Sequence, residues 1–196
     1  MFEYPSRLAA IALLLVALSP GCSKKSEPIP VAEVSEEMAP RVALAEKALD
    51  ELKATLGGRL KSGLANGVGD AVAGCSKDAG PLTQKVASKH GLALGRSSHR
   101  LRNPANGARP WVAQWLQKNS AGGWKPGKTV VYDLGNKLGV LRPIPTADKC
   151  LLCHGSPATL SAPIKAELAK SYPNDKATGF AVGDLRGVFW AEVSKK

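Results

Sequence analysis

The chain has 196 residues, with 27 Lys and Arg against 16 Asp and Glu, and its formal net charge is +11. This length fits one domain with a single hydrophobic core. The charge favours anionic partners, but aromatic residues make up only 5% of the chain and interrupt no run of Lys and Arg. A nucleic-acid-binding surface therefore has little support, and we expect no nucleic-acid partner.

The first 21 residues have the features of an export signal. Residues 8–18 form an uncharged apolar run, followed by Ser19-Pro20-Gly21-Cys22. The run has the length of a signal-peptide apolar region and is too short to span a bilayer comfortably. Gly21 before Cys22 resembles the cleavage site of bacterial lipoproteins, although Leu18 lies four residues before Cys22 and not the usual three. Ordinary cleavage after Gly21 is the alternative.

We therefore expect residues 1–21 to be a signal peptide. The mature protein is expected on the periplasmic side of a Gram-negative envelope, either lipid-anchored at Cys22 or soluble. Residues 22–36 are charged and contain Pro28 and Pro30, which predicts a tether. The folded domain is then predicted over 37–196.

Helical periodicity dominates the start of this domain. From about residue 36 to 73, apolar residues recur every three or four positions, which predicts a helix. Several glycines within this stretch predict a bend or a division into two helices. Cys75 continues the apolar stripe, so we expect it to face the core.

The rest of the chain mixes helices and strands. Gly80-Pro81 predicts an interruption and a new helix over 81–89, closed by Gly91. Extended chain follows Gly91, and the later segments are predicted as a short helix at 111–116, a hairpin of 128–132 and 137–141, a helix at 162–171 and a strand at 187–194. Helices flanking a small antiparallel sheet make an α+β domain.

The motif with the most chemical content is Cys150-Leu151-Leu152-Cys153-His154. Covalent attachment of a c-type haem needs two thiols that add to the vinyl groups and a histidine that binds the iron. A thioredoxin-like dithiol prefers a strand-to-helix start, which this region lacks. Half of a zinc site and two merely adjacent cysteines also compete with the haem interpretation; zinc needs more ligands than these three residues supply. We expect one covalent haem c, with His154 as proximal ligand.

The second axial ligand stays open on residue chemistry alone. Cys75, His90, His99 and Met38 can all bind iron. A buried cysteine at helical spacing is more often a small apolar core residue. His90 precedes the glycine that closes a helix, so we interpret it as an exposed cap.

Several separated motifs, in order, resemble a family of single-haem proteins first described in cyanobacteria. That family is catalogued as a domain of unknown function and also forms the sensory part of some bacterial histidine kinases. The matching segments cover most of residues 40–196. They are Cys75 with Ala79-Gly80-Pro81, Ser88-Lys89-His90-Gly91, Leu94-Gly95-Arg96-Ser97-Ser98, Leu101-Arg102-Asn103-Pro104-Ala105-Asn106, Pro143-Ile144, Cys150-Leu151-Leu152-Cys153-His154-Gly155, Tyr172-Pro173, Asp175, Ala177-Thr178-Gly179 and Gly183-Asp184-Leu185-Arg186-Gly187.

The resemblance implies a PAS-like antiparallel sheet with flanking helices and one c-type haem with His/Cys axial ligation. In this sequence the two ligands fall on His154 and Cys75. His99 stands where the family is expected to have an apolar residue, so it is a local substitution or a rival ligand. Arg96, Arg100 and Arg102 are candidates for pairing with the haem propionates, with ordinary surface charge as the alternative.

Two functional classes follow. The first is single-electron transfer by an exported monohaem cytochrome that is loaded by the haem-ligation machinery and works with a redox partner protein. The second is a haem-based redox or gas sensor that acts through a separate signalling partner. A catalytic role such as a peroxidase is less well supported, because no distal acid–base pair is evident; we expect the protein not to be an enzyme.

Overall fold

The computed structural model describes residues 28–122 and 124–196. The predicted signal peptide, Cys22 and the start of the predicted tether lie outside them. No helix in this part of the chain is both long and apolar enough to cross a membrane. The elements in chain order are β1 (Ile29–Pro30), α1 (Ala39–Asn66), α2 (Val68–Ala73), a π-helical turn (Gly74–Asp78), α3 (Ala79–His90), β2 (Ala93–Ser97), a 3-10 turn (Pro104–Asn106), α4 (Pro110–Asn119), β3 (Val130–Asp133), β4 (Lys137–Pro145), a 3-10 turn (Asp148–Cys150), α5 (Leu151–His154), α6 (Ala162–Ser171) and β5 (Leu185–Ser194).

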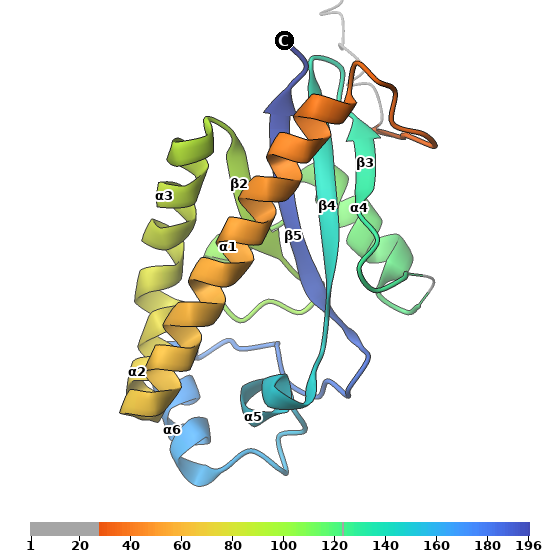
Figure 1. The fold of residues 1–196 in the computed structure, drawn as a ribbon. Coiled ribbons are helices and arrows are strands. Elements are labelled where there is room, and N and C mark those ends of the chain that lie inside the picture. Colours follow the sequence, from red (N-terminus) through yellow and green to blue (C-terminus); the bar gives the residue numbers. More distant parts are fainter. Residues whose placement is uncertain (1–27, 123) are drawn as a thin grey trace, which may run out of the picture.

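One antiparallel sheet organises the chain, with strand order β1-β3-β4-β5-β2. Helix α1 crosses one face of this sheet, with α3 beside it, and α4 covers the other face (Figure 1). Below the sheet lie α2, α5 and α6. The fold is therefore α+β and PAS-like, and it begins with a long helix, as the sequence predicts.

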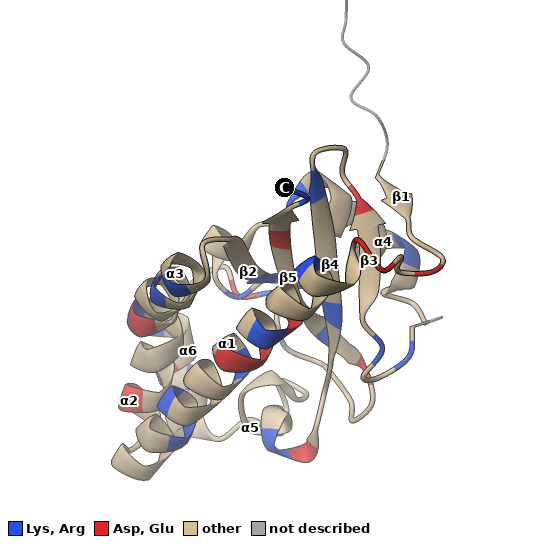
Figure 2. Cartoon of the chain, turned by 45° about the horizontal axis from the view of Figure 1, so that its top comes forward, with Lys and Arg blue, Asp and Glu red and all other residues tan. Residues whose placement is uncertain are grey.

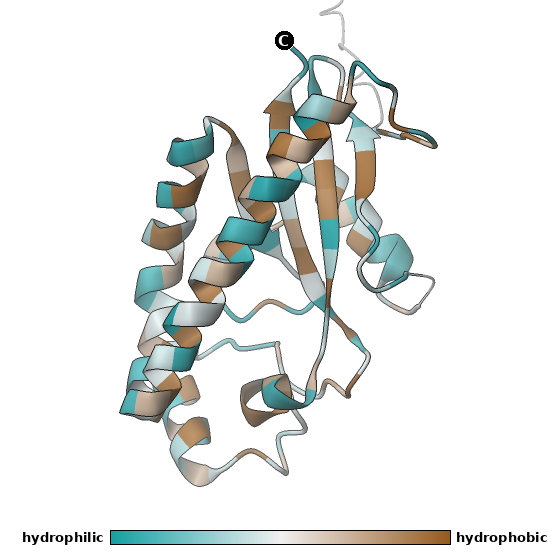
Figure 3. Ribbon diagram, viewed as in Figure 1, coloured by the Kyte–Doolittle hydropathy of each residue, from teal (hydrophilic) through white to brown (hydrophobic). Residues whose placement is uncertain are grey.

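Each face of the sheet has its own apolar core, because successive side chains on a strand point to opposite faces. Leu138 and Val140 of β4 pack against α1, whereas Leu141 packs against α4. Along β5 the same alternation places Ala191 and Val193 on the α1 side and Val188 and Trp190 on the α4 side. Figure 3 shows apolar segments recurring along α1. The α1 side is closed by Leu49 and Leu52, both fully buried. The α4 side is closed by tryptophans and aliphatic residues of α4.

Gly95 in the edge strand β2 allows a close contact with its neighbour β5. A Cβ at Gly95 would lie 2.3 Å from Cζ2 of Trp190, its cross-strand partner. Glycine at this position therefore lets the indole lie across β2. The close contact fixes β2 against β5, and β2 leads directly into the loop that carries Arg100 and Arg102.

The connection between β4 and β5 is an excursion away from the sheet. These two strands are neighbours, yet residues 146–184 separate them and form α5 and α6. The base of the excursion is closed by backbone bonds from Thr146 N to Asp184 O (2.8 Å) and from Gly183 N to Thr146 O (2.9 Å). A third apolar cluster, centred on Ile164, Leu168 and Tyr172, packs the excursion against Val72 of α2.

Two boundaries differ from the sequence prediction. The predicted tether extended to residue 36, but Ile29 and Pro30 pair with Asp133 and Tyr132 of β3, so regular structure begins earlier than 37. Proline is tolerated there because β1 is an edge strand. Gly80-Pro81 was predicted to interrupt the helix, but the chain passes from α2 through the π-helical turn into α3. The wider turn just before Pro81 accommodates a residue that lacks an N–H. The division into two helices that the glycines of residues 36–73 predict is confirmed: α1 and α2 are separated at Gly67, whose φ is +117°.

Candidate functional site

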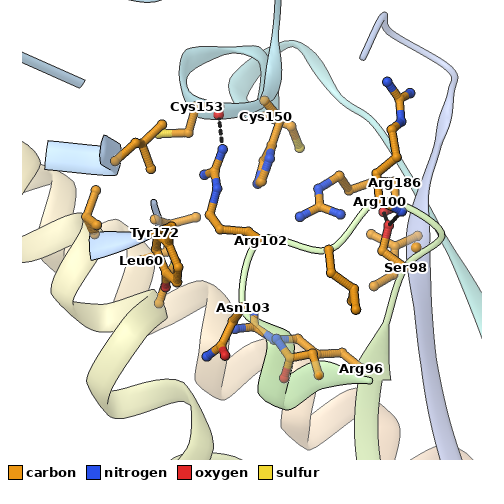
Figure 4. A pocket seen from close by; sticks show the side chains of 18 of the residues that line it. Leu60, Arg96, Ser98, Arg100, Arg102, Asn103, Cys150, Cys153, Tyr172 and Arg186 are labelled. Carbon is orange, nitrogen blue, oxygen red and sulfur yellow. Dashed lines mark hydrogen bonds between the residues drawn. The ribbon is translucent and has the colours of Figure 1, made fainter. Parts of the chain in front are cut away.

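A cavity of about 250 Å³ lies at the end of the molecule where α2, α5 and α6 meet the sheet. Its walls come from α1, the π-helical turn, β2 with the loop after it, α5, α6 and the start of β5. Figure 4 shows side chains from these segments converging on it. Seven site residues predicted from the sequence line this one cavity: Cys75, Arg96, Arg100, Arg102, Cys150, Cys153 and His154.

The two motif cysteines project from one short helical segment. Cys150 ends a 3-10 turn and Cys153 lies three residues later in α5, so the two side chains share a face of the helix. Both are free thiols. Burial raises the pKa of the Cys153 thiol, while the nearby Arg102 opposes that rise. Two half-buried thiols are thus held at fixed spacing beside the cavity.

His154 is held as a neutral imidazole. Its Nδ1 lies 2.6 Å from the carbonyl oxygen of Ala177, and because a carbonyl can only accept, Nδ1 carries the proton and donates. Burial, and then the positive charges of Arg186 and Arg102, lower the pKa of His154 to about 2. The imidazole is therefore uncharged with Nε2 unprotonated, the form in which histidine binds a metal.

Residues 175–180, which follow α6, form a brace that contacts the backbone and the imidazole of His154. Backbone bonds run from Gly179 N to Gly155 O (2.8 Å) and from Phe180 N to His154 O (3.0 Å). The Phe180 ring meets the imidazole edge-on, with ring centroids 6.2 Å apart. Ala177 N donates to Asp175 Oδ1 at 2.8 Å, which restrains the residue whose carbonyl accepts from His154.

Arg102 joins this brace to the cysteine motif. Its Nε donates to Asp175 Oδ2 at 2.9 Å, and its Nη2 donates to the carbonyl of Cys153 (Figure 4). The side chains of Arg102 and Asp175 are only 9% and 12% exposed. Arg102, predicted as a propionate partner, thus already has a carboxylate partner within the protein.

The other cavity arginines differ in their partners. Arg100 donates to the carbonyl of Thr178 at 3.0 Å and stacks 3.7 Å above the centre of the Phe180 ring. Arg186, which the sequence analysis assigned no role, has a buried Nε with no hydrogen-bond partner. Burial, and then the charges of Arg102 and Arg96, lower the pKa of Arg186 to about 10. Among the residues that the structure describes, neither Arg96 nor Arg186 forms an ion pair.

Apolar side chains form much of the remaining lining. Three leucines at the cavity keep a large exposed fraction: Leu60 at 37%, Leu64 at 43% and Leu152 at 53%. Exposed leucines gathered at one cavity are typical of a binding site for an apolar ligand. An apolar surface and partner-free cations therefore share one cavity.

Cys75 lies on a different wall from the motif cysteines. It belongs to the π-helical turn between α2 and α3, is half-buried and lines the cavity as a free thiol. The rival ligands are placed elsewhere. His99 packs edge-on against Phe180 at a centroid distance of 5.8 Å, and Met38 immediately precedes α1 and packs against the α1-side core.

The interpretation of His90 as an exposed cap is wrong. Its side chain is 7% exposed, and its Nε2 lies 2.8 Å from Glu51 Oε2 of α1. The helix does end there, because Gly91 adopts the left-handed conformation. The pairing with α1, 39 residues earlier in the chain, turns the imidazole inward. The zinc alternative also lacks its ligand set: no group of three or more His, Cys, Asp and Glu side chains suited to a metal ion occurs within residues 28–122 and 124–196.

Comparison with known proteins followed these observations. No curated protein matches the chain. The crystal structure of the cyanobacterial haem protein Tll0287 matches with a TM-score of 0.59 and 22% identity, over 83% of this chain and 98% of that chain. At this identity the match establishes a shared fold. The family model described as Tll0287-like matches residues 30–194, which is most of the chain. This protein therefore belongs to the Tll0287-like family.

Proposed function

We propose that this protein is an exported monohaem c-type cytochrome that transfers single electrons. The observation that carries the proposal is the placement of Cys150, Cys153 and His154 on one helical segment beside an apolar cavity, with Nε2 of His154 unprotonated. Membership of the Tll0287-like family, and a fold shared with a haem protein, support it.

The chemistry of the lining fits a haem. The thiols of Cys150 and Cys153 would form the two thioether bonds, and His154 would bind the iron. Leu60, Leu64 and Leu152 offer apolar surface to the ring. The cavity volume of about 250 Å³ is just under the usual lower limit of about 300 Å³ for ligand pockets, so binding of a haem would require the walls to move apart.

Arg186 and Arg96 fit the two carboxylates of a haem. A buried guanidinium without a carboxylate partner is costly, and a propionate would relieve that cost with a charge-assisted hydrogen bond. Arg100 contributes further positive charge at the same cavity. Arg102 acts mainly through Asp175, holding the brace behind His154.

Cys75 would supply the second protein ligand to the iron, because it is the remaining thiol on the cavity wall. Bound haem supplies exchange of one electron between ferric and ferrous iron. A thiolate ligand favours the ferric state and lowers the reduction potential relative to methionine. His154 and Cys75 would fill both axial positions, which is consistent with electron transfer and not with catalysis at the iron.

The remaining parts of the proposal concern the environment of the protein. Residues 1–21 direct export, Cys22 anchors the chain by a lipid on the periplasmic side, and the haem-ligation machinery loads the motif there. Lys and Arg residues lie along α1 and α3 and beside α5 (Figure 2). This excess of positive charge favours an acidic redox partner.

A haem-based sensor acting through a signalling partner is the second candidate. The observation that favours it is the position of Cys75 in a π-helical turn, an element that often marks functional sites and that can rearrange locally. Release of the Cys75 thiolate on reduction would open an iron position to a small ligand such as carbon monoxide.

The test compares purified haem-loaded wild type with Cys75→Ser by absorption and electron paramagnetic resonance. Ferric wild type should show low-spin thiolate features that are absent from Cys75→Ser. Unchanged spectra would remove Cys75 from the iron. Rapid reduction by an outer-sphere reductant, unaffected by carbon monoxide, supports electron transfer; slow reduction that accelerates with carbon monoxide supports the sensor.

A further inference from the structure

Arg59 of α1 reaches two carboxylates on the neighbouring helix. Its Nη2 lies 2.8 Å from Asp70 Oδ1, its Nη1 lies 3.1 Å from Asp70 Oδ2, and its Nε lies 2.7 Å from Asp78 Oδ2. Nη2 also donates to the backbone carbonyl of Asp70 at 3.3 Å. These hydrogen bonds raise the pKa of Arg59 above its ordinary value. One guanidinium thus uses all three of its nitrogens on two residues.

The two carboxylates flank the segment that carries Cys75. Asp70 lies in α2, before the π-helical turn, and Asp78 is the last residue of that turn. In the turn, Ala79 N donates to Gly74 O, five residues earlier, in place of the usual four. The turn therefore inserts one extra residue into the helix and sets the direction in which Cys75 leaves it.

Close packing keeps Arg59 in this position. A Cβ at Gly63 would lie 2.7 Å from Cα of Ala71, so α1 and α2 approach to backbone contact. A Cβ at Gly74 would lie 3.1 Å from Cζ of Arg59, so the guanidinium rests directly on the first residue of the π-helical turn. The side chain is 23% exposed and has little freedom to leave.

We infer that Arg59 is the positioning residue for Cys75: it pairs with Asp70, four residues before the π-helical turn, and with Asp78 at the end of the turn, and so holds the thiol toward the cavity. The inference rests on the proposed function, in which Cys75 binds the iron. A planar fork that pairs with two carboxylates cannot be replaced by the point charge of lysine, which keeps the charge but can satisfy only one arm well. Arg59→Lys should therefore loosen the turn without removing positive charge.

Arg142 provides a matched control. It also pairs with two carboxylates, Glu46 and Asp50 of α1, but it does so from β4 and does not line the cavity. Its side chain is 17% exposed, close to the 23% of Arg59. Arg142→Lys weakens another arginine–carboxylate contact, one that is not part of the cavity lining.

The test is the low-spin thiolate signal per haem in ferric, haem-loaded wild type, Arg59→Lys and Arg142→Lys, with thermal unfolding of each. The signal of Arg59→Lys should fall by half or more, and Arg142→Lys should keep the wild-type signal at a similar unfolding temperature. Full retention in Arg59→Lys, or equal loss in both variants, would overturn the inference. If Arg59→Lys does not fold, Asp78→Asn removes one arm and carries the same prediction.

A second readout separates this inference from the ligation that it assumes. If wild type shows no thiolate signal, the proposed ligation by Cys75 fails and its thiol is free to react. A short pulse of N-ethylmaleimide, followed by peptide mass spectrometry, then measures the alkylation rate of Cys75 directly. Positioning by Arg59 predicts a several-fold change in that rate in Arg59→Lys and none in Arg142→Lys; equal rates in all three proteins would contradict it.

Discussion

The sheet half and the cavity half of this molecule are stabilised in different ways. Around the sheet, apolar side chains such as Leu49, Leu138 and Val140 are completely buried between α1 and the strands. Around the cavity, short helices are joined by arginine–carboxylate pairs and backbone bonds, and leucines remain exposed. The difference indicates that hydrophobic packing stabilises the scaffold, whereas directional polar contacts position the groups that bind a ligand.

The largest stability effect should come from the sheet half. Leu49→Ala removes a completely buried side chain from the α1-side core and should cost about 3–4 kcal/mol of unfolding free energy. Urea denaturation measures this loss, with Leu49→Met as a volume-conserving control that should cost less than about 1.5 kcal/mol. The reduction potential should not change, because Leu49 does not line the cavity. A shifted potential in Leu49→Ala would break the proposed separation of the two halves.

A smaller stability loss with an altered site is expected for Asp175→Asn. The substitution leaves the buried Arg102 without its carboxylate and should cost about 2 kcal/mol, less than for a fully buried pair because both side chains keep some exposure. It also loosens Ala177, the residue whose carbonyl accepts from His154, so the reduction potential should shift. Urea denaturation measures the loss of unfolding free energy, and redox titration measures the shift in reduction potential.

Asp133→Asn is the matched control for that experiment. Asp133 likewise accepts from the backbone N–H two residues later and pairs with one cation, Lys195. Its side chain is 35% exposed and lies at the far end of the sheet. The control should cost less unfolding free energy than Asp175→Asn and leave the reduction potential unchanged. Equal effects of the two variants would argue against a special role of the Arg102–Asp175 pair.

The smallest effect on stability is expected from Glu51, which pairs with Lys89 and His90 in the sheet half, and this effect depends on pH. Hydrogen bonds from Lys89, and then from His90, lower the pKa of Glu51 below 4.5. A carboxyl whose folded-state pKa is lowered stabilises the fold above its unfolded pKa, and that contribution disappears as pH falls through the folded value. Urea denaturation at neutral pH and well below 4.5 should therefore show a smaller acid-induced loss in Glu51→Gln than in wild type. An identical acid-induced loss in Glu51→Gln and wild type would mean that the Glu51 carboxylate does not stabilise the fold through Lys89 and His90.

Sequence patterns predicted the parts of the molecule that depend on local periodicity. The long bent helix, the hairpin and the final strand follow from the spacing of apolar residues and from turn residues, and the structure contains all of them. The seven cavity residues also lie together, although their roles as ligands and propionate partners stay predictions. The motif of Cys150, Cys153 and His154 can be recognised in the sequence because its residues lie within five positions of one another.

The features that sequence alone did not show depend on partners distant in the chain. Arg102 and Asp175 are separated by 73 positions and His90 and Glu51 by 39, so no local pattern joins them. Arg186 lies within a motif that carried the family resemblance, but nothing in that motif indicates that its Nε is buried without a partner. The π-helical turn was also not predicted, because one extra residue within a helix leaves no recognisable pattern in the sequence.

Covalent attachment of haem at Cys150 and Cys153 can be tested by denaturing the protein, because a covalently bound haem stays with the unfolded chain. Wild type and a Cys150→Ser/Cys153→Ser double variant, each expressed with haem-ligation machinery, would be extracted with acidified acetone, and porphyrin absorbance measured on the remaining chain. Wild type should keep its porphyrin absorbance after extraction, and the double variant should lose it. Extraction of haem from wild type, or its retention by the double variant, would contradict covalent attachment at Cys150 and Cys153.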